Sequence, residues 1–255
     1  MQPFTYHRAA DAAAAIRAAR ARPAASQFIA GGTNMADYMK LGVLRPHQLV
    51  DINALADSGY GHIEATPQGL RLGALVRMGQ AQDHPTIRRD YPVIAQALML
   101  GASQQIRNMA SLGGNVLQRT RCEYFRETSW PCNKRNPGSG CAAMDGLNRE
   151  HAVLGTSGSC IATYHGDFAQ ALIALDARIE TLGPQGKRTM PFAALHRRPG
   201  STPHIETALQ DGELITFITV PAGPHTVRSR YVKIRDRESY QFALAAAAVA
   251  LHMEG

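Results

Sequence analysis

The chain has 255 residues, of which 45% are hydrophobic and 18% charged, with a formal net charge of +7. This composition is typical of a globular protein of one or two domains. No apolar run approaches the roughly 20 residues of a membrane helix, and residues 1–7 lack the charged-then-apolar pattern of a secretion signal. We therefore expect no membrane insertion and no export signal in this chain.

The positive charge raises the question of nucleic-acid binding. The basic residues are spread over several regions, and zinc-finger, helix-turn-helix and RNP signatures are missing from the sequence. A basic docking face or an anionic cofactor explains the charge equally well. We therefore expect no nucleic-acid partner.

The pattern of residues predicts a mixture of short strands and helices. An alanine-rich stretch over 8–22 predicts a helix that Asp11 starts and Pro23 ends. A strand, glycine turn and helix unit follows over 27–42, with its helix over 35–41 closed by Gly42. Further strands are predicted over 49–52, 70–74, 178–182, 214–220 and 229–235, and further helices over 91–100, 166–176 and 242–251.

Two glycine turns are candidates for binding a phosphate. The first, Gly31–Asn34, joins a predicted strand to a helix, and the second, Ser111–Asn115, follows a polar stretch over 104–108. Glycine permits positive φ and close approach, and a helix start offers amide donors. Two such turns could clamp one pyrophosphate from two sides. Because neither a GxGxxG nor a P-loop motif is present, two unrelated structural turns remain an alternative.

The four cysteines of the chain fall within 39 consecutive positions, with nine, eight and eighteen residues between them: Cys122, Cys132, Cys141 and Cys160. Proline, glycine and asparagine surround them, which predicts an irregular loop. Structural zinc is disfavoured because short Cys-x2-4-Cys knuckles are missing. Two disulfides are disfavoured because a chain of this length can bury its own core. An iron-sulfur cluster also needs four thiolates, and the spacing gives it a modest preference.

Basic residues lie beside these cysteines: Arg119, Arg121, Arg126, Lys134 and Arg135. Such cations would favour the thiolate form and offset the charge of an anionic cluster. The alternative is an ordinary solvated or partner-facing patch.

Several segments, taken in chain order, carry a resemblance to a known family: Ala30–Asn34, Ile106–Asn108, Gly113–Asn115, Gly166–Asp167 and Tyr231–Arg235. They resemble the FAD-binding medium subunit of the molybdenum-containing xanthine and aldehyde oxidoreductases, and the likeness covers essentially the whole chain. The four-cysteine insertion is similar to that of bacterial periplasmic aldehyde oxidoreductase, which holds a 4Fe-4S cluster. Residues 118–122, 131–135 and 137–141 carry this second match.

The resemblance implies an α+β chain with a two-subdomain FAD-binding fold of the vanillyl-alcohol-oxidase (PCMH) type and the start of a C-terminal α+β domain. The implied N-terminal FAD-binding subdomain covers residues 1–57. The second FAD-binding subdomain covers 58–212, with the iron-sulfur insertion near 117–161, and an incomplete C-terminal flavoprotein domain covers 213–255. Because the family's C-terminal domain continues further, we expect a truncated domain here.

The resemblance also implies which residues hold the cofactors. Those expected at the FAD are Ile29, Ala30, Gly31, Gly32, Thr33, Asn34, Met35, Arg107, Asn108, Ser111, Leu112, Gly113, Gly114, Asn115, Asp167, Ile215 and Lys233. From the residues alone, Asp167 would be a helix N-cap, Lys233 an exposed strand cation and Ile215 part of the core. The four cysteines would ligate the 4Fe-4S cluster, and no residue of this chain is expected to be catalytic.

The implied function is electron transfer within an oxidoreductase. The partners would be a large subunit with the molybdenum cofactor and a 2Fe-2S small subunit, in a heterotrimer that passes electrons through FAD to an external acceptor. The expected location is the periplasm if a partner carries an export signal, and otherwise the cytoplasm. Two other hypotheses stay open: a flavin-free, metal-clasped module that braces its partners, and a nucleic-acid-binding zinc protein.

Overall fold

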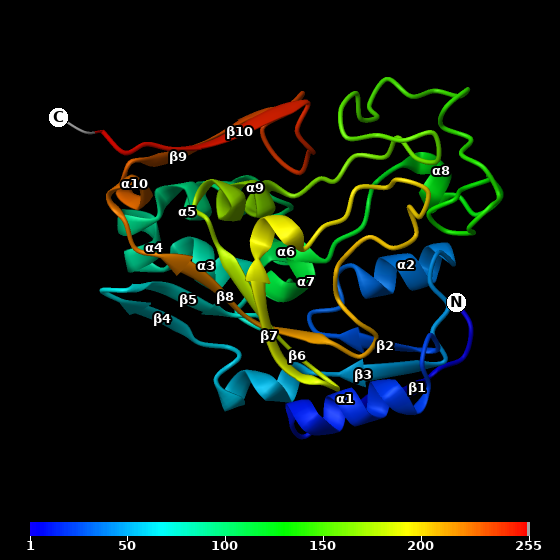
Figure 1. The fold of residues 1–255 in the computed structure, drawn as a ribbon, viewed down its shortest axis with the longest axis horizontal. Helices are drawn as coiled ribbons and strands as arrows, with labels where there is room; N and C mark the ends of the chain where they lie inside the picture. The colour runs from blue at the N-terminus through cyan, green and yellow to red at the C-terminus, as the bar shows by residue number, and fades with distance from the viewer. Residues whose placement is uncertain (254–255) are drawn as a thin grey trace.

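The computed structural model describes residues 1–253, and its first fifty residues form a small parallel sheet (Figure 1). Strands β1 (Thr5–Arg8), β2 (Ser26–Ile29) and β3 (Gln48–Asp51) pair in the order β1-β3-β2. Helices α1 (Ala12–Ala21) and α2 (Met35–Leu41) connect them on opposite faces of the sheet. Parallel neighbours need such crossover connections.

The ends of these two helices follow from local chemistry. The side chain of Asp11 accepts a hydrogen bond from Ala14 N at 2.6 Å, which caps α1 as predicted. Gly42 has φ of 73°, a left-handed conformation that glycine adopts without steric cost, and it ends α2 as predicted. The buried stripe Ala12, Ala15 and Ile16 of α1 packs against the sheet.

A second, antiparallel sheet follows, with strand order β4-β5-β8-β6-β7. Its strands are β4 (Ile63–Thr66), β5 (Gly69–Gly73), β6 (Arg178–Gly183), β7 (Gly186–Pro191) and β8 (Leu214–Pro221). The central strand β8 pairs with both β5 and β6. The sheet therefore uses residues from both sides of the boundary expected between 212 and 213.

Helices gather over one face of this second sheet and enclose the main core (Figure 1). Buried residues of α5, such as Ile94 and Leu98, pack there with Phe168 of α9 and Ile218 of β8. The helical elements are η1 (Asn53–Ser58), α3 (Met78–Asp83), α4 (Pro85–Asp90), α5 (Pro92–Leu100), α6 (Gln104–Met109), α7 (Leu112–Val116), α9 (Asp167–Ala174), η2 (Phe192–Ala194) and α10 (Pro224–Val227). Most of these helices are short, so packing onto the sheet stabilises them more than helix propensity does.

The prediction of a helix over 242–251 is wrong. Strand β10 (Ala245–Ala250) pairs antiparallel with β9 (Ser229–Ile234), with Ala248 opposite Tyr231. Alternate alanines of β10 at 246, 248 and 250 pack against the main core, a period of two that suits a strand. Pairing with β9 and this contact outweigh the helix propensity of alanine.

The cysteine segment is irregular, as predicted. Between α7 and α9 the only helix or strand that the structure assigns is the short helix α8 (Glu123–Arg126). The segment occupies one side of the molecule, above α2 in Figure 1. Within residues 1–253, no helix is long and apolar enough to span a membrane.

Candidate functional site

The structure brings the two predicted glycine turns together. Asn34 in the first turn donates from Nδ2 to the carbonyl oxygen of Gly114 in the second, at 3.3 Å. A Cβ atom added to Gly31 would stand only 1.8 Å from the carbonyl oxygen of Met109, just before the second turn. Gly31 therefore lets the two backbones approach. Gly32 has φ of +75°, which also favours glycine.

The first turn presents unpaired backbone amides. Within residues 1–253, the N–H groups of residues 31–35 have no hydrogen-bond acceptor in the protein. The amides of residues 112–115 all donate internally, such as Gly113 N to Ala74 O at 2.8 Å and Gly114 N to Ser111 Oγ at 3.2 Å. Consecutive free amides suit a phosphate group. The first turn therefore supplies donors, while the second supplies a rigid platform.

Hydrogen bonds of Arg77 and Asn53, which the sequence did not indicate, hold the two turns together. Arg77 donates from Nη1 to Met109 O at 2.7 Å and from Nη2 to Asn53 Oδ1 at 2.8 Å. Asn53 Nδ2 in turn donates to Ala30 O at 2.9 Å. Burial lowers the pKa of the Arg77 guanidinium. No local motif marks these residues, because each is far from its partners in the sequence.

Arg107 and Asn108, both predicted at the FAD, lie in α6 and make hydrogen bonds within that helix and to the turn before it. Arg107 donates from Nη1 to Gly101 O at 2.8 Å and from Nη2 to Gln104 Oε1 at 2.7 Å. Asn108 Oδ1 accepts from Gln104 Nε2 at 2.8 Å. Nε of Arg107 is buried without a partner among the described residues, and burial lowers the guanidinium pKa. These contacts brace the loop between α5 and α6.

Asp167 and Lys233 lie together in the structure. Lys233 Nζ is 2.8 Å from Asp167 Oδ2, and the hydroxyl of Tyr231 donates to Asp167 Oδ1 at 2.6 Å. The alternative that Lys233 is an exposed cation is wrong, because its side chain is 1% exposed. Asp167 is the first residue of α9, and Gly166 occupies the N-cap position. Burial, reinforced by Asp167, raises the pKa of Tyr231.

Ile215 belongs to the main core, close to the second turn. It is buried in β8 and shares a hydrophobic cluster with Leu112. Its neighbour Thr216 accepts from Ala74 N at 2.9 Å, and Ala74 O accepts from Gly113 N. Through Ala74, the backbone of β8 beside Ile215 is therefore linked to the second turn.

The four cysteines are free thiols in the irregular segment between α7 and α9. Cys132 and Cys160 are buried, Cys122 and Cys141 are half-buried, and no disulfide joins them. Cys132 and Cys141 face each other across an isolated antiparallel bridge. Burial raises the pKa of both Cys122 and Cys160, and the thiols of Cys132 and Cys141 raise both pKa values further.

The basic residues around the cysteines are paired with protein groups. Arg119 and Lys134 form ion pairs with Glu206, and Arg121 and Arg126 form ion pairs with Asp37. The expectation that these cations favour thiolates holds only in part. Lys134 lowers the pKa of Cys160, but burial outweighs it and the net pKa is raised. The solvated-patch alternative does not describe these paired side chains either.

No single-ion metal site is formed by the described residues. Within residues 1–253, no three His, Cys, Asp or Glu side chains lie close enough together to hold one metal ion. His151 is a further neighbour that the sequence did not indicate, with Nε2 3.1 Å from Cys122 Sγ. The four thiols therefore do not form a tetrahedral cage among the described residues.

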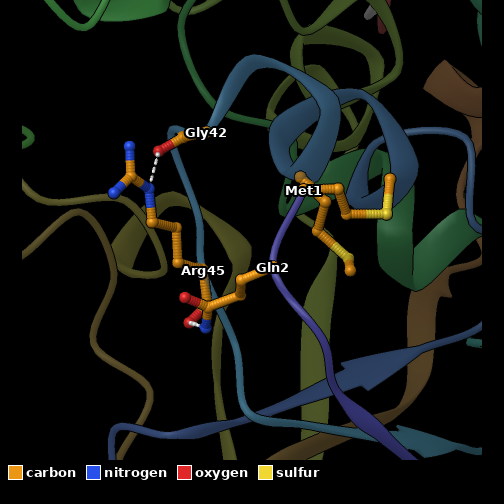
Figure 2. A pocket seen from close by; sticks show the side chains of 5 residues that line it. Met1, Gln2, Gly42 and Arg45 are labelled. Atoms are coloured by element: carbon orange, nitrogen blue, oxygen red, sulfur yellow. Dashed lines mark hydrogen bonds between the residues drawn. The ribbon is translucent and has the colours of Figure 1, made fainter.

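Two surface hollows lie apart from the glycine turns. Figure 2 shows the first of them beyond the end of α2, where Gly42 O accepts a hydrogen bond from Arg45 Nε at 3.3 Å. The volume of this hollow is about 250 Å³. The other, of about 390 Å³, lies between the same loop and the cysteine segment. Its lining residues are Gly42, Val43, Arg45, Thr128, Arg135 and Asn136. Neither hollow is lined by a residue predicted to bind a cofactor.

Comparison with known proteins places this geometry in a family. Residues 2–223 match the family described as "FAD binding domain in molybdopterin dehydrogenase". The chain is 50% identical over 257 residues to the aldehyde oxidoreductase FAD-binding subunit PaoB of Escherichia coli, covering 100% of this chain and 79% of that protein. It is 26% identical to the carbon monoxide dehydrogenase medium chain of Afipia carboxidovorans, covering 99% of this chain and 70% of that one.

Solved structures agree on the fold. The chain matches reconstituted CO dehydrogenase from Oligotropha carboxidovorans with a TM-score of 0.73 and 24% identity, covering 100% of this chain and 72% of that one. It matches quinoline 2-oxidoreductase from Pseudomonas putida with a TM-score of 0.70 and 21% identity, covering 100% and 70%. The match over residues 2–223 and the 50% identity settle the family: the chain belongs to the FAD-binding domains of the molybdopterin dehydrogenases.

Proposed function

We propose that this chain is an FAD-binding electron-transfer subunit of a molybdenum-dependent aldehyde oxidoreductase. The observation that carries the proposal is the 50% identity, over the whole chain, with the aldehyde oxidoreductase FAD-binding subunit of E. coli. The unpaired amides of residues 31–35 support it, because consecutive free amides suit the phosphates that the resemblance places at this turn. The alternative of a flavin-free bracing module leaves these amides without a role.

The residues of this chain have separate tasks toward FAD, which supplies one- and two-electron redox chemistry when bound. The first turn, with Thr33 and Asn34, would hold the pyrophosphate through backbone and side-chain donors. Ser111–Asn115 would support the ribityl region. The buried group of Asp167, Tyr231 and Lys233 would fix one wall of the site, since its polar atoms are bonded to one another.

We further propose that the four cysteines hold a 4Fe-4S cluster. Around one tetrahedral zinc ion, thiolate sulfurs stand only about 3.8 Å apart, and no such close group exists among residues 1–253. In a four-iron cluster each thiolate binds a different iron, so the ligands are spread more widely. Four free thiols in one irregular segment, two of them buried and two opposite each other across a backbone bridge, are compatible with that arrangement.

The proposed partners are a molybdenum-cofactor subunit and a 2Fe-2S subunit. The names of the relatives support this, because both describe a subunit or a medium chain of a larger enzyme. We propose a periplasmic location if one of the partners carries an export signal.

Cofactor analysis of the purified full chain tests these proposals. FAD is released by heat and measured by fluorescence, and iron and zinc are measured by elemental analysis. We expect one FAD and about four irons per chain, with zinc near zero. A folded chain without FAD would favour the bracing module, and a folded chain with zinc would favour the zinc protein. Cys160→Ser should lose iron and keep FAD.

A further inference from the structure

The helix that follows the first glycine turn also holds the segment around Cys122. Arg121 and Arg126 flank this cysteine, and both reach Asp37 of α2. Arg126 donates from Nη1 and Nη2 to the two carboxylate oxygens of Asp37 at 2.7 and 3.0 Å. Arg121 Nη1 donates to Asp37 Oδ2 at 3.3 Å. One carboxylate therefore fixes both sides of Cys122.

The same contacts extend to the glycine turns. Arg121 donates from Nη2 to Asn34 Oδ1 at 3.2 Å, and Asn34 Nδ2 donates to Gly114 O at 3.3 Å. The residue directly before Cys122 is thus two hydrogen bonds away from the second turn. The turn that presents free amides and the loop that presents Cys122 share one support.

An apolar contact reinforces this support. Tyr38 and Val43 form a small buried cluster with Phe125 and Cys132, and Cys122 packs at its edge. The hydroxyl of Tyr38 accepts a hydrogen bond from the backbone N–H of Arg119 at 2.8 Å. The cluster fixes the distance between α2 and the cysteine segment, and Asp37 fixes its orientation.

The charge of Asp37 matters because its partners are partly buried. The side chains of Arg121 and Arg126 are 23% and 27% exposed. Among the described residues, the side chain of Arg126 donates only to Asp37. Hydrogen bonds from Arg126 hold the pKa of Asp37 below its usual value. Without the carboxylate, two neighbouring cations would repel each other and release the loop.

We propose that Asp37 is a positioning residue that fixes Cys122 relative to the first glycine turn by pairing with the two arginines that flank the cysteine. The identity of the group that Cys122 holds rests on the proposed function, whereas the positioning of Cys122 does not. Asp37 and Arg121 are 84 residues apart in the sequence, so their contact joins the cysteine segment to helix α2.

Alkylation of the iron-free full chain tests the positioning directly. Iodoacetamide labelling is followed by mass spectrometry for each cysteine in wild type, Asp37→Asn and Asp37→Glu. We expect Cys122 to react about tenfold faster in Asp37→Asn, the effect of losing about 1.4 kcal/mol of local stability. Cys160 should be unchanged, and Asp37→Glu should stay close to wild type. Equal rates for Cys122 in all three proteins, or equal acceleration of every cysteine, would overturn the proposal.

A matched control removes an ion pair elsewhere. Glu180 pairs with Arg71 at 3.1 Å and is 30% exposed, close to the 31% of Asp37, and its hydrogen-bond partners Arg71 and Thr216 lie outside the cysteine segment. Glu180→Gln should leave all four alkylation rates unchanged. If Asp37→Asn does not fold, Arg126→Gln removes the bidentate pair from the other side, and the same selective increase at Cys122 is expected.

The iron-loaded chain gives a second readout. Removing a negative charge beside the cysteine segment stabilises the reduced, more negative form of a cluster, so the reduction potential of Asp37→Asn should rise while FAD content stays at the wild-type level. An unchanged potential together with an unchanged Cys122 rate would contradict the role of Asp37. Wild-type protein without iron would instead refute the cluster, and the alkylation result would still decide the positioning.

Discussion

Lys233 and Asp167 form an ion pair with an N–O distance of 2.8 Å, and the lysine side chain is 1% exposed. Removing one partner of a buried pair leaves the other charge uncompensated. We expect Lys233→Ala to lower the free energy of unfolding by about 3 to 5 kcal/mol in urea titrations. The double variant Lys233→Met/Asp167→Asn should lose less stability than the sum of the losses for Lys233→Met alone and Asp167→Asn alone. Additive costs would show that the two side chains do not interact.

Gly31 is the position where the two turns leave no room for a side chain. A Cβ there would stand 1.8 Å from Met109 O, a backbone atom that cannot move alone. Gly31→Ala should separate the turns, lower stability by about 1 to 3 kcal/mol, and reduce FAD content. The control is Gly158→Ala, because a Cβ at Gly158 meets nothing within 4 Å. Equal FAD content in the two variants would contradict the packed-turn geometry.

The sequence predicted those parts of the fold that local chemistry determines. Helix α2 has the predicted bounds because a glycine turn starts it and Gly42 ends it. The comparisons confirm the family suggested by the glycine turns together with residues 106–108, 166–167 and 231–235. The hairpin β9–β10 was missed because alanine is a good helix former and only the adjacent strand and core make a strand favourable.

Long-range polar contacts could not be read from the sequence. Asp37 lies one turn after Asn34 on the same face of α2, but nothing in its neighbourhood indicates that Arg121 and Arg126 bind it. The burial of Lys233 could not be predicted either. Successive residues of a strand point to opposite faces, and the sequence does not show which face of β9 is buried. Charge pairing that closes loops of more than 60 residues depends on the packed fold.

His165 makes the stability of the protein sensitive to acid. Burial, with the charges of Arg121, Lys233 and His151, lowers its pKa to about 4 from the usual 6.5. The unfolded chain therefore binds more protons between these values, so stability falls as the pH drops from about 6.5 to about 4. The slope from this one proton is at most about 1.4 kcal/mol per pH unit.

The variant His165→Phe tests this origin of the acid sensitivity. It keeps a ring beside Phe242, whose centroid is 4.5 Å from that of His165, and removes the titrating group. Urea unfolding at a series of pH values should show a shallower loss of stability for the variant in this window. The same slope in both proteins would assign the acid sensitivity to other groups.

Glu206 attaches the cysteine segment to the loop before the central strand of the second sheet. Its carboxylate accepts from Arg119 Nε at 2.5 Å and lies 3.4 Å from Lys134 Nζ, and all three side chains are less than a quarter exposed. Lys134 also donates to Pro203 O at 3.0 Å. Glu206→Gln removes the charge that two partly buried cations share. The cysteine segment should therefore detach from this loop more often.

Limited trypsin digestion measures how often the cysteine segment opens, because Arg149 lies exposed in this segment. We expect cleavage after Arg149 to be several-fold faster in Glu206→Gln, with the rest of the chain cut at the wild-type rate. The matched control is Glu64→Gln, which removes a more exposed pair with Arg71 at 3.5 Å, outside the insertion. If Glu206→Gln and Glu64→Gln are cut after Arg149 at the same rate, the apolar cluster around Phe125 and Cys132 holds the cysteine segment without help from Glu206.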